Sequence, residues 1–478
     1  MAGASVSRAI GVVVVCGVLL VSGLLLNMQI QSIAEQKDYN KGYEIGLEAY
    51  TYGLPLLVTE VTFQTMTSIN VSYGAYGPVN QFNNVRVLNN QNSTAVVAPG
   101  ANSLSSIAWL DLSGEPQVLH VPEVVDHFFV LAFIDPYTND VRNFGSVPDT
   151  TPGDYTIVGP GNGVVSIPAN VTRVDVEYDR IWIIGSTQLK GSSDLTNVNN
   201  IQDNYTITPL SQYGTDYRPA TPTDPNTNVQ VHKIPSGLGF FDMMGHLLEQ
   251  FPPPAADQPA LNRFAEVGIG PGMTPSLNEE LNKDVIRGLQ DAVAAGPAQI
   301  KNETMAVFLE SFDQHNGYLV GGFGEYGTNY QLRAVISQIG LGAFTSDQAI
   351  FAMSWTDINK RPLMGSTNYV LHMESFPPVT EGWTLTAYNL TGAMIPNSIY
   401  RYQFNDASNL TRNDDGSVDF YLQSTAPTDP AKFNNWLPTP ADGTGFEIMW
   451  RLLAPNSADI PDILNGTGWL PPEITVVA

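Results

Sequence analysis

An unbroken apolar segment at residues 10–26 constrains the fold of this 478-residue chain more than any other feature. An α-helix rises about 1.5 Å per residue, and the apolar core of a bilayer is roughly 30 Å thick. Because no charged residue lies between Arg8 and Glu35, residues 10–30 predict a transmembrane helix that anchors the protein in a membrane. Arg8 precedes the segment, so the positive-inside rule predicts a single-pass membrane protein with a cytosolic tail and an extracellular or lumenal body.

A cleaved signal peptide is the alternative interpretation of this segment, because Ser32, Ile33 and Ala34 offer a weak cleavage site. Cleavage would leave the body secreted. The segment is longer than the usual apolar stretch of a signal peptide, about 7–15 residues, so an anchor is favoured. Asn-x-Ser/Thr sequons accept glycans in a secretory compartment. The glycosylation candidates are Asn70, Asn92, Asn170, Asn204, Asn302, Asn389, Asn409 and Asn465.

The charge and cysteine content exclude several classes of function. The net charge is −25, and nucleic-acid binding needs clustered Lys and Arg, so no nucleic acid is expected as a partner. The single cysteine, Cys16, lies inside the apolar segment. The body therefore has no disulfide, no thiol nucleophile and no cysteine-bound zinc. It must be held together by burial of its apolar residues, which make up 43% of the chain.

Hydrophobic periodicity divides the body into helical and strand-rich parts. Apolar residues at spacings of three and four predict a helix over residues 38–66. Alternating patterns and turn residues predict strands over 71–210, including a buried strand at 128–134, and strands again from 352 onward.

The region between the two strand-rich parts has helical patterns. A Pro-, Thr- and Asp-rich linker covers residues 211–226, and a helix is predicted at 240–251, before three prolines. Ser276 and Glu279 match the capping-box pattern, which predicts that a second helix begins at Ser276.

Ordered motifs in both strand-rich parts resemble a known pair of domains. The first part resembles the family called domain of unknown function 1254, through Gly-Pro-Val-Asn-Gln-Phe at 77–82, Ala-Trp-Leu-Asp-Leu at 108–112 and the stretch 202–210. The second part resembles domain of unknown function 1214. Its motifs are Asn-Tyr-Gln-Leu-Arg-Ala at 329–334, Pro-Pro-Val at 377–379, Trp-Thr-Leu-Thr-Ala-Tyr at 383–388, Arg-Tyr at 401–402 and Asn-Trp-Leu-Pro-Thr-Pro at 435–440.

The strand patterns and this resemblance together predict a mainly β protein with a helical connector. Two β-sandwich- or jelly-roll-like domains are expected behind the N-terminal transmembrane helix. The predicted segments are 1–34 for the tail and anchor, 35–225 for a helix and the first β domain, 226–325 for the connector and 326–478 for the second β domain. The resemblance implies no particular activity.

The chain departs from the first family's usual pattern at several polar positions. Residues 102–106 read Asn-Ser-Leu-Ser-Ser where the family usually has Asp-Thr-Leu-Tyr-Ser. Asn84 replaces a usual His, Ser186 replaces a usual Arg, and residues 127–129 read His-Phe-Phe in place of Arg-Tyr-Tyr. Most of these exchanges remove a group that could titrate near neutrality. A reactive site in this domain would therefore be lost or altered.

Arginines and aromatic residues in the second domain are the main candidates for a ligand site. Arginines are scarce in this chain, and an arginine beside aromatic rings can bind an anionic or sugar-like ligand; packing in the core is the structural alternative. The candidates are Arg333, His372, Trp383, Tyr388, Arg401, Tyr402, Trp436 and Arg451.

Metal sites and cofactor motifs are not expected. The sequence has no Gly-x-Ser-x-Gly elbow, no His-Glu-x-x-His pair and no phosphate-binding loop. His372 and Glu374 would share a strand face, but a metal would need a third ligand such as Asp357, so a solvated surface is favoured. The Asp-Gly pair at 415–416 favours a hairpin turn over a calcium loop.

Two functions remain open from the sequence. The first is a membrane-anchored, outward-facing protein that binds a small-molecule or glycan ligand or a partner, or has a structural role at a surface. The second is an extracellular hydrolase of a sugar-like or small polar substrate, with Asp414 and Asp419, or Asp357 and Glu374, as the acid and base. Homo-oligomerisation also stays open.

Overall fold

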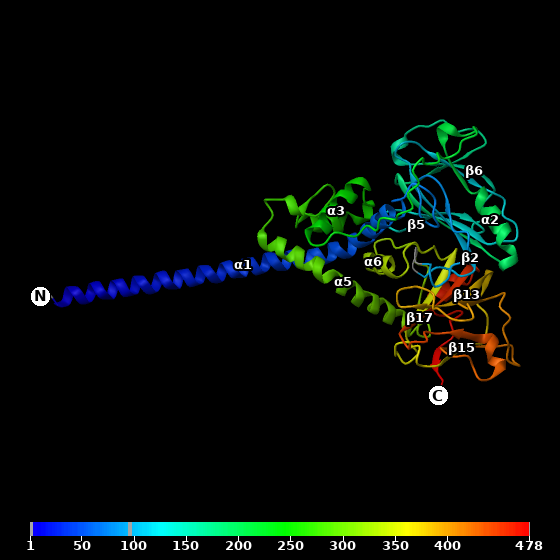
Figure 1. Cartoon of the computed structure of the whole chain (residues 1–478). Helices are drawn as coiled ribbons and strands as arrows, with labels where there is room; N and C mark the ends of the chain where they lie inside the picture. Colours follow the sequence, from blue (N-terminus) through cyan, green and yellow to red (C-terminus); the bar gives the residue numbers. More distant parts are fainter. Residues whose placement is uncertain (1–2, 94–97, 478) are drawn as a thin grey trace. The chain divides into compact units, whose positions relative to one another are not determined.

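The computed structural model describes residues 3–93 and 98–477, with side chains from Leu25 onward apart from Ser192. Helices and sheets are mixed along the described chain (Figure 1). The longest helices are α1 (Gly3–Met66) and α5 (Lys283–Phe312). The predicted class, mainly β with two sandwich- or jelly-roll-like domains behind a transmembrane helix, is therefore wrong. The fold is mixed α and β with several sheets.

The predicted transmembrane anchor also needs correction. Among the described residues, no helix combines the length and the apolar character that crossing a membrane requires. Residues 10–24 of the predicted anchor lie outside those with described side chains. Residues 25–34 of α1 are uncharged but include polar Asn27, Gln29, Gln31 and Ser32, whereas a span needs roughly 20 mostly apolar residues. The helix then continues through charged Glu35 and Lys37 to Met66. The predicted single-pass location is therefore contradicted, and the expected membrane contact at 10–30 stays a prediction.

Contacts divide the chain into two compact units. The first unit contains Met1–Gly53 and Ile234–Gln299, and the second contains Leu54–Lys233 and Ile300–Ala478. Both α1 and α5 run through the division, so each unit holds part of both helices.

The first unit is helical. Besides its parts of α1 and α5 it contains α3 (Leu238–Gln250) and α4 (Gln258–Ala265). Glycine lets α1 and α5 approach closely, because a Cβ atom at Gly42 would lie 2.3 Å from the carbonyl oxygen of Val285. Deeper in the unit, the buried Tyr52 hydroxyl donates a hydrogen bond of 2.8 Å to Asp257.

The first half of the second unit contains two sheets. One has the order β1-β2-β8-β4-β5, and the other has the order β7-β6-β3-β9. Apolar residues from both sheets share one core, so the sheets pack face to face. The strands are β1 (Asn83–Asn84), β2 (Ser103–Asp111), β3 (Gln117–Val121), β4 (Phe129–Ile134), β5 (Asp140–Gly145), β6 (Gly153–Val158), β7 (Thr172–Asp175), β8 (Arg180–Gln188) and β9 (Thr206–Pro209), with helix α2 (Leu195–Asn204) before β9.

The second half of this unit repeats the arrangement. One sheet has the order β10-β11-β17-β13-β14 and the other the order β16-β15-β12-β18, and both contribute to a second shared core. The strands are β10 (Leu319–Gly321), β11 (Ala349–Ser354), β12 (Tyr369–Met373), β13 (Val379–Asn389), β14 (Gln403–Asn405), β15 (Val418–Gln423), β16 (Trp436–Pro438), β17 (Phe446–Pro455) and β18 (Ile474–Val476). Helix α6 (Tyr330–Ile339) lies between β10 and β11 in sequence, and α7 (Ile460–Leu464) lies between β17 and β18.

Local predictions differ in outcome. The buried strand predicted at 128–134 is confirmed as β4, and the helix at 240–251 is confirmed as α3. The helix start at Ser276 is wrong, because α5 begins at Lys283. The backbone N–H of Ser276 instead donates to the carboxylate of Asp242 at 3.0 Å, so this polar pattern fixes a loop.

Candidate functional site

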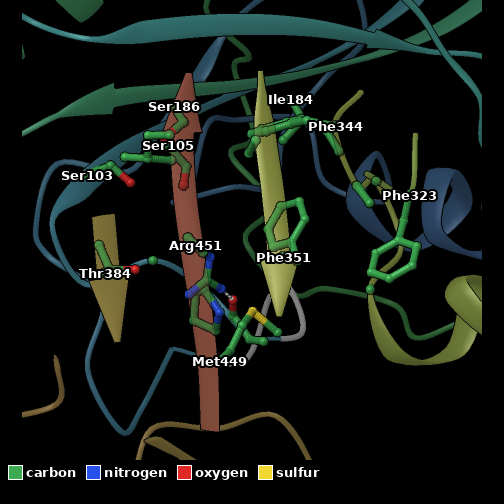
Figure 2. Close-up of a pocket in the computed structure, with 18 of the residues that line it drawn as sticks. Ser103, Ser105, Ile184, Ser186, Phe323, Phe344, Phe351, Thr384, Met449 and Arg451 are labelled. Carbon is green, nitrogen blue, oxygen red and sulfur yellow. Dashed lines mark hydrogen bonds between the residues drawn. The ribbon is translucent and has the colours of Figure 1, made fainter. Parts of the chain in front are cut away.

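A cavity of about 170 Å³ lies between the two β halves of the second unit (Figure 2). Strands β2 and β8 form its wall on one side, and β11, β13 and β17 form it on the other. Residues 339–344, which follow α6, close part of its circumference. The cavity is therefore built by both halves together.

The wall from the first half changes from polar to apolar along paired strands. In the register of β2 and β8, Ser103 lies opposite Gln188, and Ser105 lies opposite Ser186. The next row toward the interior is apolar, with Ile184 at the cavity, followed by Trp109 and Trp182, whose rings stack at 4.8 Å. Side chains two apart on a strand share a face, so this gradient lies on one surface.

The hydroxyl groups at the polar end are available to a ligand. Within the described part of the chain, the Ser105 and Ser186 hydroxyls form no hydrogen bond to protein, whereas the neighbouring Ser106 hydroxyl, on the opposite face, accepts one from Gln202. Both serines are partly buried and line the cavity. Their small side chains leave space where longer ones would fill it.

The wall from the second half is centred on β17. Arg451 lies between Phe351 of β11 and Thr384 of β13 in the strand register, and Met449 lies two residues before it on the same face. Figure 2 shows Arg451 in the middle of the cavity wall, with Thr384 to one side and Phe351 to the other. A cationic side chain is thus placed at the border between polar and apolar lining.

Arg451 is held by neutral partners. Its Nη1 donates to the Tyr388 hydroxyl at 2.9 Å, and its Nη2 donates to the carbonyl oxygen of Ala98. Tyr388 in turn donates to the carbonyl oxygen of Pro99 at 2.8 Å. No described carboxylate forms an ion pair with Arg451. Beside it, the hydroxyl of Thr384 is buried and has no partner among the described atoms.

The electrostatic surroundings compensate the charge of Arg451 only in part. Glu447 is four residues earlier on the same face of β17, but burial raises the pKa of its carboxyl to about 7, and Arg451 only partly opposes this. Burial also raises the pKa of Tyr388, so its hydroxyl stays neutral. Of the ionisable groups near the guanidinium, none is a firmly ionised acid at neutral pH.

The eight predicted ligand-site residues do not converge. Only Arg451 lines the cavity, and Tyr388 supports it from behind. Trp383 is in the core of the second half, and Arg333 is buried on α6 with its guanidinium 5.4 Å from the ring centre of Tyr137.

The other predicted residues have contacts elsewhere in the second half. Arg401 donates to the carbonyl oxygens of Phe433 and Trp436 at 2.7 and 2.8 Å, and the Trp436 indole donates to Gln423. Tyr402 donates to Gln91 in a separate surface hollow.

The predicted catalytic and metal groups also lie away from the cavity. His372 is half exposed on β12, with Nδ1 2.6 Å from a carboxylate oxygen of Asp419. Asp357 is buried and accepts backbone hydrogen bonds from Asn359 and Arg361. Among the residues whose side chains the structure describes, no three His, Cys, Asp or Glu side chains are grouped to hold a metal ion.

Sequence reasoning missed most of the lining, including Phe351, Met449 and the serines. A signal for two of them existed, because Ser105 and Ser186 replace the Tyr and Arg that are usual in the resembling family. The structure shows that these two positions face each other across β2 and β8. Both exchanges therefore replace a large side chain with a small one at the same point of the cavity wall.

Comparisons with known proteins agree with the motif evidence. Residues 79–209 match the family described as Protein of unknown function (DUF1254), and residues 348–457 match Protein of unknown function (DUF1214). The predicted resemblance, with the first domain N-terminal to the second, is confirmed. No curated protein matches the chain.

A solved structure shows a similar fold. The crystal structure of the VPA0106 protein from Vibrio parahaemolyticus is similar with a TM-score of 0.62 and 20% identity, over 91% of this chain and 100% of that one. An uncharacterized protein from Burkholderia cenocepacia has a TM-score of 0.41 and 14% identity, over 93% of this chain and 96% of that one. The first likeness concerns the fold alone.

Proposed function

The chain carries a DUF1254 domain followed by a DUF1214 domain, and we propose that it binds a small, largely apolar carboxylate in the cavity between them. The observation that carries this proposal is the guanidinium of Arg451, which forms no ion pair with a described carboxylate and lies in a mostly apolar hollow. Removing a charge from water is costly unless an opposite charge or several hydrogen bonds replace the water. A bound anion would supply both.

A carboxylate suits this position chemically. Guanidinium groups present planar N–H donors that match the two oxygens of a carboxylate. Arg451 uses two donations on Tyr388 and Ala98 and keeps further N–H groups. The hydroxyl of Thr384 is next to it in the strand register and can donate to the same anion.

The rest of the ligand must be apolar and small. Phe351, Met449, Ile184 and Phe344 line the remaining wall. A cavity of about 150 Å³ is known to accept benzene, so a volume of about 170 Å³ suits a single ring with a small substituent. Benzoate is the simplest molecule with both features.

The strongly acidic composition does not oppose this ligand at short range. The net charge of −25 acts on an approaching anion from a distance, but salt at 0.15 M screens charges beyond about 8 Å. Inside the cavity the nearest charge is Arg451, so the local field favours an anion.

Calorimetry with matched ligands tests the proposal. Benzoate should bind at least about tenfold more tightly than benzyl alcohol, because a hydrogen bond to a charged group contributes about 1.5–3 kcal/mol. Arg451→Met should remove this preference, and Arg451→Lys should keep part of it. Arg401→Met is the control, since Arg401 bonds backbone carbonyls outside the cavity. Equal binding of the two ligands to the native protein, or an unchanged preference in Arg451→Met, would overturn the proposal.

A further inference from the structure

Gln188, the last residue of β8, lies where the cavity meets a second hollow. Gln188 and Asn102 line both the cavity and an open groove of about 880 Å³ on the same side of the unit. The groove has mixed polar and apolar lining and belongs to both β halves. Its polar lining includes Lys190, Glu381, Gln403, Asn405, Ser408 and Arg412.

The polarity of the cavity wall points toward this groove. The row of Ser103 and Gln188 is the one that reaches the groove, the row of Ser105 and Ser186 follows, and the apolar row with Ile184 is deepest. Figure 2 shows the labelled serines on one side of the cavity and the phenylalanines on the other. The polar end of the cavity therefore lies toward the groove.

Arg451 on β17 also lies near the groove end of the cavity. Trp383 lines the groove, and the next residue of β13, Thr384, lines the cavity opposite Arg451. Arg451 is thus one residue deeper along the sheet than the point where the groove meets the cavity. A bound carboxylate would lie at the groove end of the cavity, and the ring would lie deeper.

The side chain of Gln188 crosses the junction between the groove and the cavity and is held there by one weak hydrogen bond. Its backbone N–H is fixed by a 2.9 Å bond to the carbonyl oxygen of Phe128. Its amide Nε2 donates to the carbonyl oxygen of Glu381, on the opposite β half, at 3.3 Å. A neutral hydrogen bond of this length is long, and side-chain rotation can break it at low cost.

We infer that Gln188 controls passage between the groove and the cavity, and is therefore a specificity-determining residue for ligand entry. This inference rests on the proposed function. With the amide on Glu381, the side chain spans the mouth between the two β halves, and with the amide rotated away, the mouth is open. The residue admits narrow molecules that enter ring first, and the carboxylate reaches Arg451 last.

Stopped-flow kinetics with benzoate tests this role. Gln188→Ala should raise the association and the dissociation rates together, by about two- to tenfold, because one weak hydrogen bond no longer holds the mouth closed. The equilibrium affinity should change less than about twofold. Gln188→Trp should slow both rates. Gln403→Ala is the matched control, since Gln403 lines the groove and not the cavity, and it should leave both rates unchanged.

The outcomes separate this inference from the proposed function. Unchanged rates in Gln188→Ala, or a change in dissociation alone, would show that Gln188 is a wall or contact residue and would overturn the inference. A loss of the preference for benzoate over benzyl alcohol would bear on Arg451 and the proposed function, not on Gln188. If benzoate does not bind, the same rates are measured with benzyl alcohol, whose ring needs the same entrance but no cation. Circular dichroism of each variant confirms that it is folded.

Discussion

The two faces of strand β17 show how one segment serves two different environments. Its inner residues, Phe446, Ile448, Trp450 and Leu452, are all fully buried in the core of the second β half. Its outer residues, Glu447, Met449, Arg451 and Leu453, face the seam between the β halves, where the last three line the cavity. Because side chains alternate along a strand, adjacent residues can be assigned to packing and to binding independently.

The difference between the two faces of β17 shows where this molecule tolerates imperfect packing. The inner face carries only aliphatic and aromatic side chains, and its aromatic rings make edge contacts, such as Trp450 with Phe420 at 5.7 Å. The outer face keeps a cation, a near-neutral acid and a hollow. Interiors of proteins are normally close-packed, so the cavity with unused donors is the feature on which the proposed ligand site rests.

The largest expected effect is on the inner face. Trp450→Ala should lower the free energy of unfolding by about 3–5 kcal/mol, since a large buried ring is replaced by a void. Urea denaturation followed by circular dichroism measures this. On the outer face, Glu447→Gln should not lower stability at pH 7, because the raised pKa of this buried acid means that its ionisation destabilises the fold, and a neutral amide avoids that cost. Equal losses in the two variants would contradict the division of the strand.

The second expected effect is a loss of stability as the pH rises, caused by buried acids. Burial raises the pKa of Asp135 to about 6, and that of Asp140 and Glu447 to about 7, against about 4 in an unfolded chain. Between pH 4 and 7 the folded state therefore binds more protons than the unfolded state. Stability is fully present at low pH and is lost as the pH rises through these values. From pH 5 to pH 8 we expect a loss of at least about 2 kcal/mol.

This pH effect has a specific control. Asp140 accepts hydrogen bonds from the Thr345 backbone and the Asn143 amide, each at 3.0 Å, and its other oxygen has no described partner. Asp140→Asn should flatten the dependence of unfolding free energy on pH. The comparison is made in about 0.5 M salt, which screens the general repulsion of this acidic chain. Stability that rises from pH 5 to pH 8 would disprove the assignment.

The third expected effect is a loss of ligand affinity, caused by a substitution that fills the cavity from the first β half. Ser105→Phe should occupy the space beside Ser186 and lower the affinity for benzoate by more than about tenfold. Its stability should be equal to or above that of the native protein if the ring fits without strain. Calorimetry and thermal unfolding on the same samples measure both quantities. Ser106→Ala, at the adjacent buried position on the opposite face, should leave the affinity unchanged.

The sequence predicted some of these features and missed others for physical reasons. The family motifs and the strand β4 were recognisable because local order and hydrophobic patterns determine them. The fold class was misjudged because α1 continues past residue 34 into a long helix, and a local pattern does not show where a helix packs. Arg451 stood out as a rare cation. The pairing of Ser105 with Ser186 depends on a register between distant strands, which no local pattern contains.

The smallest expected effect is at a surface pair that resembles a reactive site in composition only. His372 and Asp419 face each other across β12 and β15, and the Asp419 hydrogen bond raises the pKa of His372. The stabilisation is present below the unfolded pKa of about 6.5 and is lost as the pH rises through the higher folded value. The imidazole is half exposed, so solvent screens the pair, and His372→Gln should cost less than about 1 kcal/mol at pH 6 and almost nothing at pH 9. Urea denaturation at the two pH values measures this, with Asp419→Asn as the matched variant. A loss at pH 6 as large as that in Trp450→Ala would mean that the exposed face of β12 is as important to the fold as the inner face of β17.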